Sequence, residues 1–76
     1  MMIILNSRIF GKNVRYLRRK RKMSMFHLAR QLELSPWQLY RIEQGRTLEL
    51  EDLLMKWICS ALSEDMQTMI YEKLYE

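Results

Sequence analysis

The side chains best suited to binding chemistry lie in one short stretch, residues 35–46. At helical spacing, Trp37, Tyr40, Arg41 and Gln44 fall on the side opposite to the apolar residues of this stretch. Arg41 is the most selective of them, because a planar guanidinium donates two parallel hydrogen bonds to a partner such as the edge of a guanine. The stretch therefore predicts a binding surface that the surrounding elements must hold in position.

Catalytic and metal-binding chemistry has little support in the sequence. His27 is the single histidine, and no group of Cys, His, Asp and Glu has the spacing of a metal site. No glycine-rich loop is available to hold a nucleotide phosphate. Acidic residues cluster where helices are expected to begin, which suits the helix dipole: Glu49, Glu51, Asp52, Glu64 and Asp65. We therefore expect no enzymatic activity, no metal, no cofactor and no small-molecule ligand.

The charge is distributed unevenly between the two halves of the chain. The net charge of +4 combines +9 over residues 1–46, where eleven Lys and Arg face two acids, with −5 over residues 47–76. A basic run covers residues 18–22. A basic first half favours a polyanionic partner, and an acidic second half does not.

The sequence has the composition of a cytoplasmic protein. A single cysteine cannot form an internal disulfide, so a reducing compartment is the default. The apolar start, residues 1–5, lacks a positive leader and is far shorter than the core of a signal peptide. No stretch approaches the length needed to cross a bilayer, so we expect no membrane contact.

Apolar residues recur at helical spacing along the whole chain. This pattern predicts five short helices and no strand in a single domain of residues 1–76, with a core at about residues 7–62. The first helix should begin at Asn6 or Ser7 and run to about Lys20, and Ser24 should cap the second. The two glycines and the single proline each lie near an expected helix end.

The strongest local signal is the sequence S-P-W-Q at residues 35–38. It combines a capping serine, a proline at the first helical position and a glutamine that can close a capping box. Gly45 supplies the left-handed residue that ends this helix, and the next should begin at Thr47 or Glu49. Residues 24–45 are therefore expected to form two short amphipathic helices joined by a tight turn.

Four motifs together resemble the Cro/repressor helix-turn-helix family, also called the XRE family. They are F-G-K-N-V-R-Y-L-R, M-S-M-F-H-L-A-R-Q-L, L-S-P-W-Q-L-Y-R-I-E-Q-G-R and M-K-W-I-C-S-A-L, and they cover roughly residues 9–62. The resemblance implies an all-α, five-helix, lambda-repressor-like domain. It also implies a transcriptional regulator, in our interpretation a repressor, that binds double-stranded DNA sequence-specifically.

The resemblance assigns roles to individual residues. Arg18 and Glu43 match an ion pair that would tie the first helix to the end of the third, with the arginine fork near a phosphate. The third helix would lie in the major groove, with Arg41 as the leading candidate for base readout. The remaining readout candidates are Trp37, Tyr40 and Gln44, and the candidates for backbone contacts are Lys12, Arg15, Arg18, Ser35 and Arg46. Each has an alternative as an ordinary solvated side chain. Cys59 falls where the family has a small core residue, which predicts inert packing.

The sequence departs from the family pattern at two places, the opening of the second helix and the start of the third. Met25, Phe26 and His27 replace the glutamine and acidic residues that commonly open the second helix, and Trp37 replaces a small polar residue. Trp37 could contact a thymine methyl, pack along the sugar backbone or stack with Arg41. It could instead join Met25 and Phe26 in a patch that binds protein. The competing function is therefore a protein-interaction module of the same fold, such as an antitoxin-like or anti-regulator subunit.

The last predicted helix, residues 63–75 with Ser63 as its cap, carries an apolar stripe. Met66, Met69, Ile70 and Leu74 follow the spacing i, i+3, i+4 and i+8. This stripe and residues 1–5 could fold back on their own domain or join two copies. Because paired half-sites raise affinity and selectivity, we expect a homodimer on a palindromic operator through this helix, helped by the fourth helix or residues 1–5.

Overall fold

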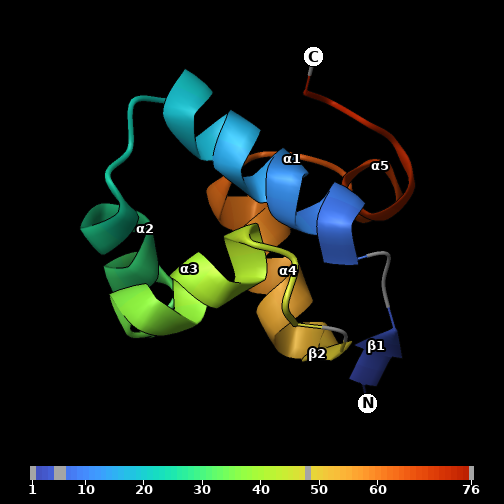
Figure 1. Ribbon diagram of the computed structural model, residues 1–76, viewed down its shortest axis with the longest axis horizontal. Helices are drawn as coiled ribbons and strands as arrows, with labels where there is room; N and C mark the ends of the chain where they lie inside the picture. Colours follow the sequence, from blue (N-terminus) through green and yellow to red (C-terminus); the bar gives the residue numbers. More distant parts are fainter. Residues whose placement is uncertain (1, 5–6, 48, 76) are drawn as a thin grey trace.

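The computed structural model describes residues 2–4, 7–47 and 49–75. Within them the chain forms five helices and two short strands, in the order β1 (Met2–Ile4), α1 (Ser7–Lys20), α2 (Met25–Gln31), α3 (Pro36–Glu43), β2 (Glu49–Glu51), α4 (Asp52–Ala61) and α5 (Met66–Tyr71). Helix α1 crosses the molecule, with α2 toward its last turn, α5 toward its first turns, and α3 running alongside it between them (Figure 1). The expected helical, lambda-repressor-like fold is confirmed.

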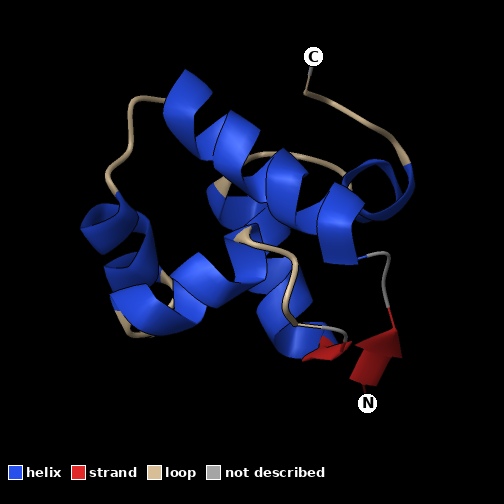
Figure 2. Ribbon diagram, viewed as in Figure 1, coloured by secondary structure: helices blue, strands red, loops and turns tan. Residues whose placement is uncertain are grey.

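The expectation of no strand is wrong. Strands β1 and β2 form an antiparallel pair in which Met2 faces Glu51, Ile3 faces Leu50 and Ile4 faces Glu49 (Figure 2). Helix α4 consequently begins at Asp52, and not at Thr47 or Glu49. Residues 2–4 thus fold back on their own domain, whereas Met1, Leu5 and the alternative cap Asn6 lie outside the described residues.

Local capping chemistry fixes the helix-turn-helix. Ser24 Oγ accepts a hydrogen bond from the backbone N–H of His27 at 3.0 Å, as expected for the cap of α2. The predicted capping box of α3 is complete: Ser35 Oγ accepts from Gln38 N at 3.1 Å, and Gln38 Oε1 accepts from Ser35 N at 2.8 Å. Gly45 follows α3 with φ at 75°, the left-handed conformation predicted for it.

The last helix differs from its prediction at both ends. Ser63 has φ at 53° and closes α4 through a hydrogen bond from its N–H to Ser60 O, so it does not cap α5. Asp65 is the cap, because its Oδ2 accepts from the N–H groups of Gln67 and Thr68. Helix α5 ends at Tyr71, and the chain then continues without regular structure.

The core collects apolar side chains from every helix and from β2: Phe10, Val14, Leu17, Leu28, Ala29, Leu32, Leu39, Ile42, Leu50, Met55, Ile58, Cys59, Leu62, Met69 and Ile70. The stripe predicted to join two copies belongs to this core. Met69 and Ile70 are buried in their own domain, and Met66 and Leu74 pack against it. The expected dimer contact through α5 stays a prediction, and only the partly buried Met66 and Leu74 remain available for it.

Gly11 allows α1 and α3 to approach closely. A Cβ atom at this position would collide with the backbone oxygens of Ile42 and Glu43, at 2.8 Å from the latter. Gly11 lies inside α1, so the expectation that both glycines mark helix ends is wrong for it.

Asn13, which sequence reasoning did not single out, joins the C-terminal segment to α1. Its side chain is completely buried. Nδ2 donates to Met69 O at 2.9 Å and to Glu72 O at 2.6 Å, while Oδ1 accepts from Leu74 N at 2.9 Å. One side chain thus satisfies three backbone groups within residues 69–74, at the C-terminal end of the domain.

Replacing Asn13 with alanine should loosen this segment. We expect Asn13→Ala to lower the free energy of unfolding by about 1–3 kcal/mol, because three backbone groups lose their partner. Urea denaturation measures the change, and limited proteolysis should show earlier cleavage after Tyr71. Ser60→Ala, at an exposed helical site, is the control. Equal stability of the two variants would contradict this role.

Candidate nucleic-acid interface

Helix α3 buries one face and exposes the other. Leu39, Ile42 and Glu43 are buried against the rest of the domain. Trp37, Tyr40, Arg41 and Gln44 are exposed, so the predicted outward face is available to a ligand. The exposed fraction of Trp37 is 61%, which is unusual for so large an apolar side chain.

A buried ion pair fixes the orientation of this helix. Arg18 Nε donates to Glu43 Oε2 at 2.7 Å, and Nη2 donates to Oε1 at 3.1 Å. The third nitrogen, Nη1, donates to Met23 O at 2.9 Å in the connection between α1 and α2. The pair implied by the family resemblance is therefore present. With its side chain 11% exposed, Arg18 has little surface left for the phosphate contact that was also expected of it.

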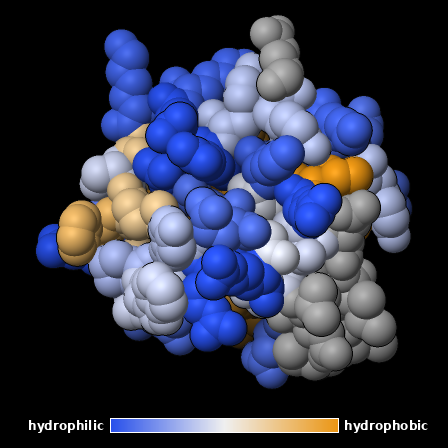
Figure 3. Space-filling view, viewed as in Figure 1, coloured by the Kyte–Doolittle hydropathy of each residue, from blue (hydrophilic) through white to orange (hydrophobic). Residues whose placement is uncertain are grey.

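Aromatic side chains form an exposed cleft between α2 and α3. The rings of Trp37 and Tyr40 stack with centroids 5.5 Å apart and planes 17° from parallel, so Trp37 stacks with Tyr40 and not with Arg41. The cleft has a volume of about 470 Å³, and we call it the aromatic cleft; it is lined by Met25, Phe26, Pro36, Trp37, Tyr40 and Arg46. The space-filling view shows apolar side chains gathered at the α2 end of the molecule, with hydrophilic ones around them (Figure 3).

Cationic side chains line one face of α1. We define the basic strip as Arg8, Lys12, Arg15 and Arg19, which are all exposed and follow the spacing i, i+4, i+7 and i+11. Three of them line a groove that reaches Gln44 at the end of α3. Sequence reasoning selected Lys12 and Arg15 but missed Arg8 and Arg19, although their helical spacing was visible in the sequence.

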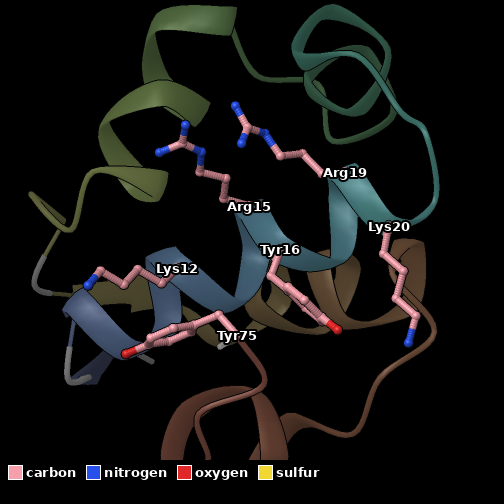
Figure 4. A pocket seen from close by; sticks show the side chains of 6 residues that line it. All are labelled: Lys12, Arg15, Tyr16, Arg19, Lys20 and Tyr75. Atoms are coloured by element: carbon pink, nitrogen blue, oxygen red, sulfur yellow. The ribbon is translucent and has the colours of Figure 1, made fainter.

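Three residues of the basic strip, Lys12, Arg15 and Arg19, also line a second, larger groove. This groove reaches Tyr75, near the C-terminal end of the chain. Figure 4 shows Arg15 and Arg19 extending to the α2 and α3 side of α1, whereas Tyr16 and Lys20 extend to the opposite side. Lys12 Nζ lies 5.2 Å from the centroid of the Tyr75 ring, and Lys20 Nζ lies 5.9 Å from that of Tyr16. These cation–π contacts hold two ammonium groups against aromatic faces.

Arg41, Arg46 and Ser35 complete the predicted set. Arg41 is exposed on the side of α3 that faces Thr47 and Leu54, away from the basic strip, and Arg46 borders the aromatic cleft. Ser35 Oγ accepts the capping hydrogen bond, which leaves its O–H free to donate outward. The exposed readout candidates thus lie on α3 itself. The basic strip of α1 meets the end of α3 at Gln44, and Arg46 lies beside the aromatic cleft.

Comparison with known proteins identifies this arrangement. Residues 13–71 match the family model of the Cro/C1-type HTH DNA-binding domain, which covers most of the chain. The chain belongs to the Cro/C1-type helix-turn-helix family. It is therefore a DNA-binding domain of the kind found in transcriptional regulators. No curated protein matches the sequence.

Solved structures share the Cro/C1-type fold. The clp gene regulator ClgR from Corynebacterium glutamicum has 26% identity and a TM-score of 0.77, over 86% of this chain and 68% of that one. The restriction-modification controller protein C.AhdI from Aeromonas hydrophila has 20% identity and a TM-score of 0.74, over 84% and 96%. Hydroxypropylphosphonic acid epoxidase from S. wedmorenis matches at 22% identity and a TM-score of 0.80, with 90% of this chain against 36% of the enzyme, a likeness of fold alone.

Cys59 is buried in the core of this Cro/C1-type domain. Burial, together with the negative charges of Asp65 and Glu64, raises the pKa of Cys59 to about 11, so its thiol stays protonated at neutral pH. Among the described residues, no three of His, Cys, Asp and Glu come together as they would around a metal ion. The described helices are also too short or too polar to span a membrane.

Removing one partner of the buried ion pair should be costly. We expect Arg18→Ala to lower the free energy of unfolding by about 3–5 kcal/mol, because Glu43 would remain buried without a counter-charge. Urea denaturation followed by circular dichroism measures this loss. The matched control is Arg19→Ala, one residue along α1 and exposed, which should stay within about 0.5 kcal/mol of the wild type. Equal losses in the two variants would show that the pair does not hold α3.

Proposed function

We propose that the chain is a transcriptional repressor that binds a palindromic operator as a homodimer, with α3 in the major groove. The observation that carries the proposal is the exposed outer face of α3, held by a buried ion pair and flanked by exposed cations. A rigid helix with such a border suits the groove of a polyanionic duplex. The names of ClgR and C.AhdI, a gene regulator and a controller protein, support a regulatory role.

In the proposed complex, base contacts and phosphate contacts come from different residues. Arg41 extends freely from α3 and would donate two hydrogen bonds to a guanine, while Tyr40 and Gln44 would contact neighbouring base edges or phosphates. Lys12 and Arg15 would bind one phosphate backbone, and Ser35 and Arg46 would bind phosphates beside the aromatic cleft. The proposed place of action is the cytoplasm, where a lone cysteine stays reduced.

Helix α4 is the proposed dimer surface, since Met69 and Ile70 of the α5 stripe are buried in their own domain. Leu53 and Trp57 lie one turn apart on α4 and have exposed fractions of 51% and 43%. Two neighbouring large apolar side chains on an otherwise polar surface favour contact with another protein surface. A second copy of the chain would provide the same stripe in a twofold arrangement.

A second candidate function rests on the aromatic cleft. Phe26, 71% exposed, and Trp37 form an apolar surface that could bind a protein partner, as in an antitoxin-like or anti-regulator subunit. Salt dependence separates the two functions, because only duplex binding releases condensed counterions.

Two arginine variants test the proposed contacts. A duplex is first selected from a random pool, and its affinity is measured by fluorescence anisotropy at several salt concentrations. We expect the logarithm of the affinity to fall with the logarithm of salt by about 0.9 for each phosphate contact. Arg41→Ala should cost about 1–3 kcal/mol on the selected duplex and relax preference at one base pair, whereas Arg46→Ala should weaken binding equally on all sequences.

Lys73→Ala, an exposed position in the acidic half of the chain, is the control and should bind as the wild type does. Uniform losses in both arginine variants would move base readout away from Arg41. A salt slope near zero on every duplex would reject DNA binding and favour the protein-interaction module.

Charge on the apolar stripe of α4 should separate the two copies. We expect Trp57→Glu to sediment as a monomer in analytical ultracentrifugation and to lose operator affinity by about 10²-fold, because linked binding of two half-sites is lost. Tyr71→Glu, also an exposed aromatic position but on α5, should remain dimeric. A dimer that survives Trp57→Glu would exclude α4 as the interface.

A further inference from the structure

The aromatic cleft has no role in the proposed contacts of Arg41 and the basic strip. It is lined by Met25 and Phe26 from the first turn of α2 and by Pro36, Trp37 and Tyr40 from the first five residues of α3, around an open space of about 470 Å³. These are the two helices that form the helix-turn-helix. Any ligand that covers the start of α3 must therefore also meet this apolar surface.

The charges around the aromatic cleft restrict its occupant. Arg46 lines the cleft, Arg41 lies one turn beyond Trp37 on α3, and the first half of the chain carries a net charge of +9. An apolar ligand carrying its own positive charge would be repelled, whereas a polyanion would be attracted. A polyanion that exposes an apolar group therefore suits both the charge and the apolar lining of the aromatic cleft.

Duplex DNA has one such group in its major groove. The C5-methyl of thymine is the apolar feature that a side chain can contact there, beside the hydrogen-bonding edges of the bases. We infer that the aromatic cleft binds pyrimidine C5-methyl groups, so that this chain selects sites with thymine, or 5-methylcytosine, next to the base pair contacted by Arg41. The inference rests on the proposed function and names the base chemistry that it requires.

The geometry of the aromatic cleft suits a methyl group. The Trp37 and Tyr40 rings lie nearly parallel and support each other, so the wall on α3 is a preformed surface. Phe26 stands on the other helix and lines the same open, shallow cleft, so a methyl seated on it loses contact with water on the side that faces the protein. At such a position, thymine makes an apolar contact with the cleft through its methyl group, and cytosine does not. This difference adds to any difference in hydrogen bonding.

Replacing thymine with deoxyuridine tests the inference, because it removes the methyl and keeps the base pair. Each thymine of the selected operator is replaced in turn, and the affinity of the wild-type protein is measured by fluorescence anisotropy. We expect about a fourfold loss per methyl at one or two positions in each half-site, the factor that corresponds to burying one carbon. Placing 5-methylcytosine for cytosine at the same positions should bind more tightly than cytosine.

Two variants assign the effect to the aromatic cleft. Trp37→Gln, at an exposed position, should bind thymine and deoxyuridine operators equally well. Arg46→Ala is the matched variant from the same cleft, and should bind both operators more weakly while keeping the fourfold difference between them. Circular dichroism checks that both variants retain the wild-type helix content.

The outcomes distinguish this inference from the proposed function. A steep salt dependence without any effect of deoxyuridine, or a selected consensus without thymine, overturns methyl binding and leaves DNA binding standing. Wild-type affinity of Trp37→Gln for every duplex also overturns it, and points to a protein partner for the aromatic cleft. No binding to any duplex at low salt overturns the proposed function and the inference together.

Discussion

The buried pair of Arg18 and Glu43 orients α3 against α1, and the outward face of α3 and its side of the aromatic cleft depend on that orientation. The guanidinium binds both carboxylate oxygens and one backbone oxygen, at Met23. A planar fork with two parallel hydrogen bonds restricts angle as well as distance. Its contribution lies in orientation more than in stability, since the desolvation of two charges offsets much of their attraction. Gly11 adds the close approach of the two helices that this geometry requires.

The ion pair also shapes the charge of the surface. Glu43 is one of only two acids in residues 1–46, and it is buried against an arginine. The basic strip therefore faces solvent without an acid of α1 to neutralise it, as the helix has none. Because acids gather in the second half of the chain, the molecule presents a strongly basic portion to an approaching polyanion. Glu43 thus helps to orient α3, and because it is buried and paired with Arg18, the surface around the basic strip remains positively charged.

A feature could be predicted from the sequence where the interacting residues lie close together in the chain, and not where they lie far apart. The capping box at residues 35–38 and the left-handed Gly45 are local, so residue types alone predict them. Asn13 could not be found in this way, because its partners lie 56 to 61 residues further along the chain. The strands β1 and β2 are each three residues long, too short for an alternating pattern to emerge. In the candidate site, helical spacing predicted the outward face of α3 but could not reveal that Trp37 stacks with Tyr40.

The stripe on α5 shows a limit of amphipathic patterns in general. Spacing of i, i+3, i+4 and i+8 establishes that one face is apolar, yet a domain's own core and a second copy satisfy it equally well. Here the hydrogen bonds of Asn13 to Met69, Glu72 and Leu74 hold the backbone of this segment against α1, and Met69 and Ile70 pack into the core of their own domain. The large apolar side chains that remain exposed on α2, α3 and α4 then acquire more significance. A small domain that draws its last helix inward to complete its core, and still leaves Phe26, Trp37 and Trp57 outside, has its apolar surface where partners can cover it.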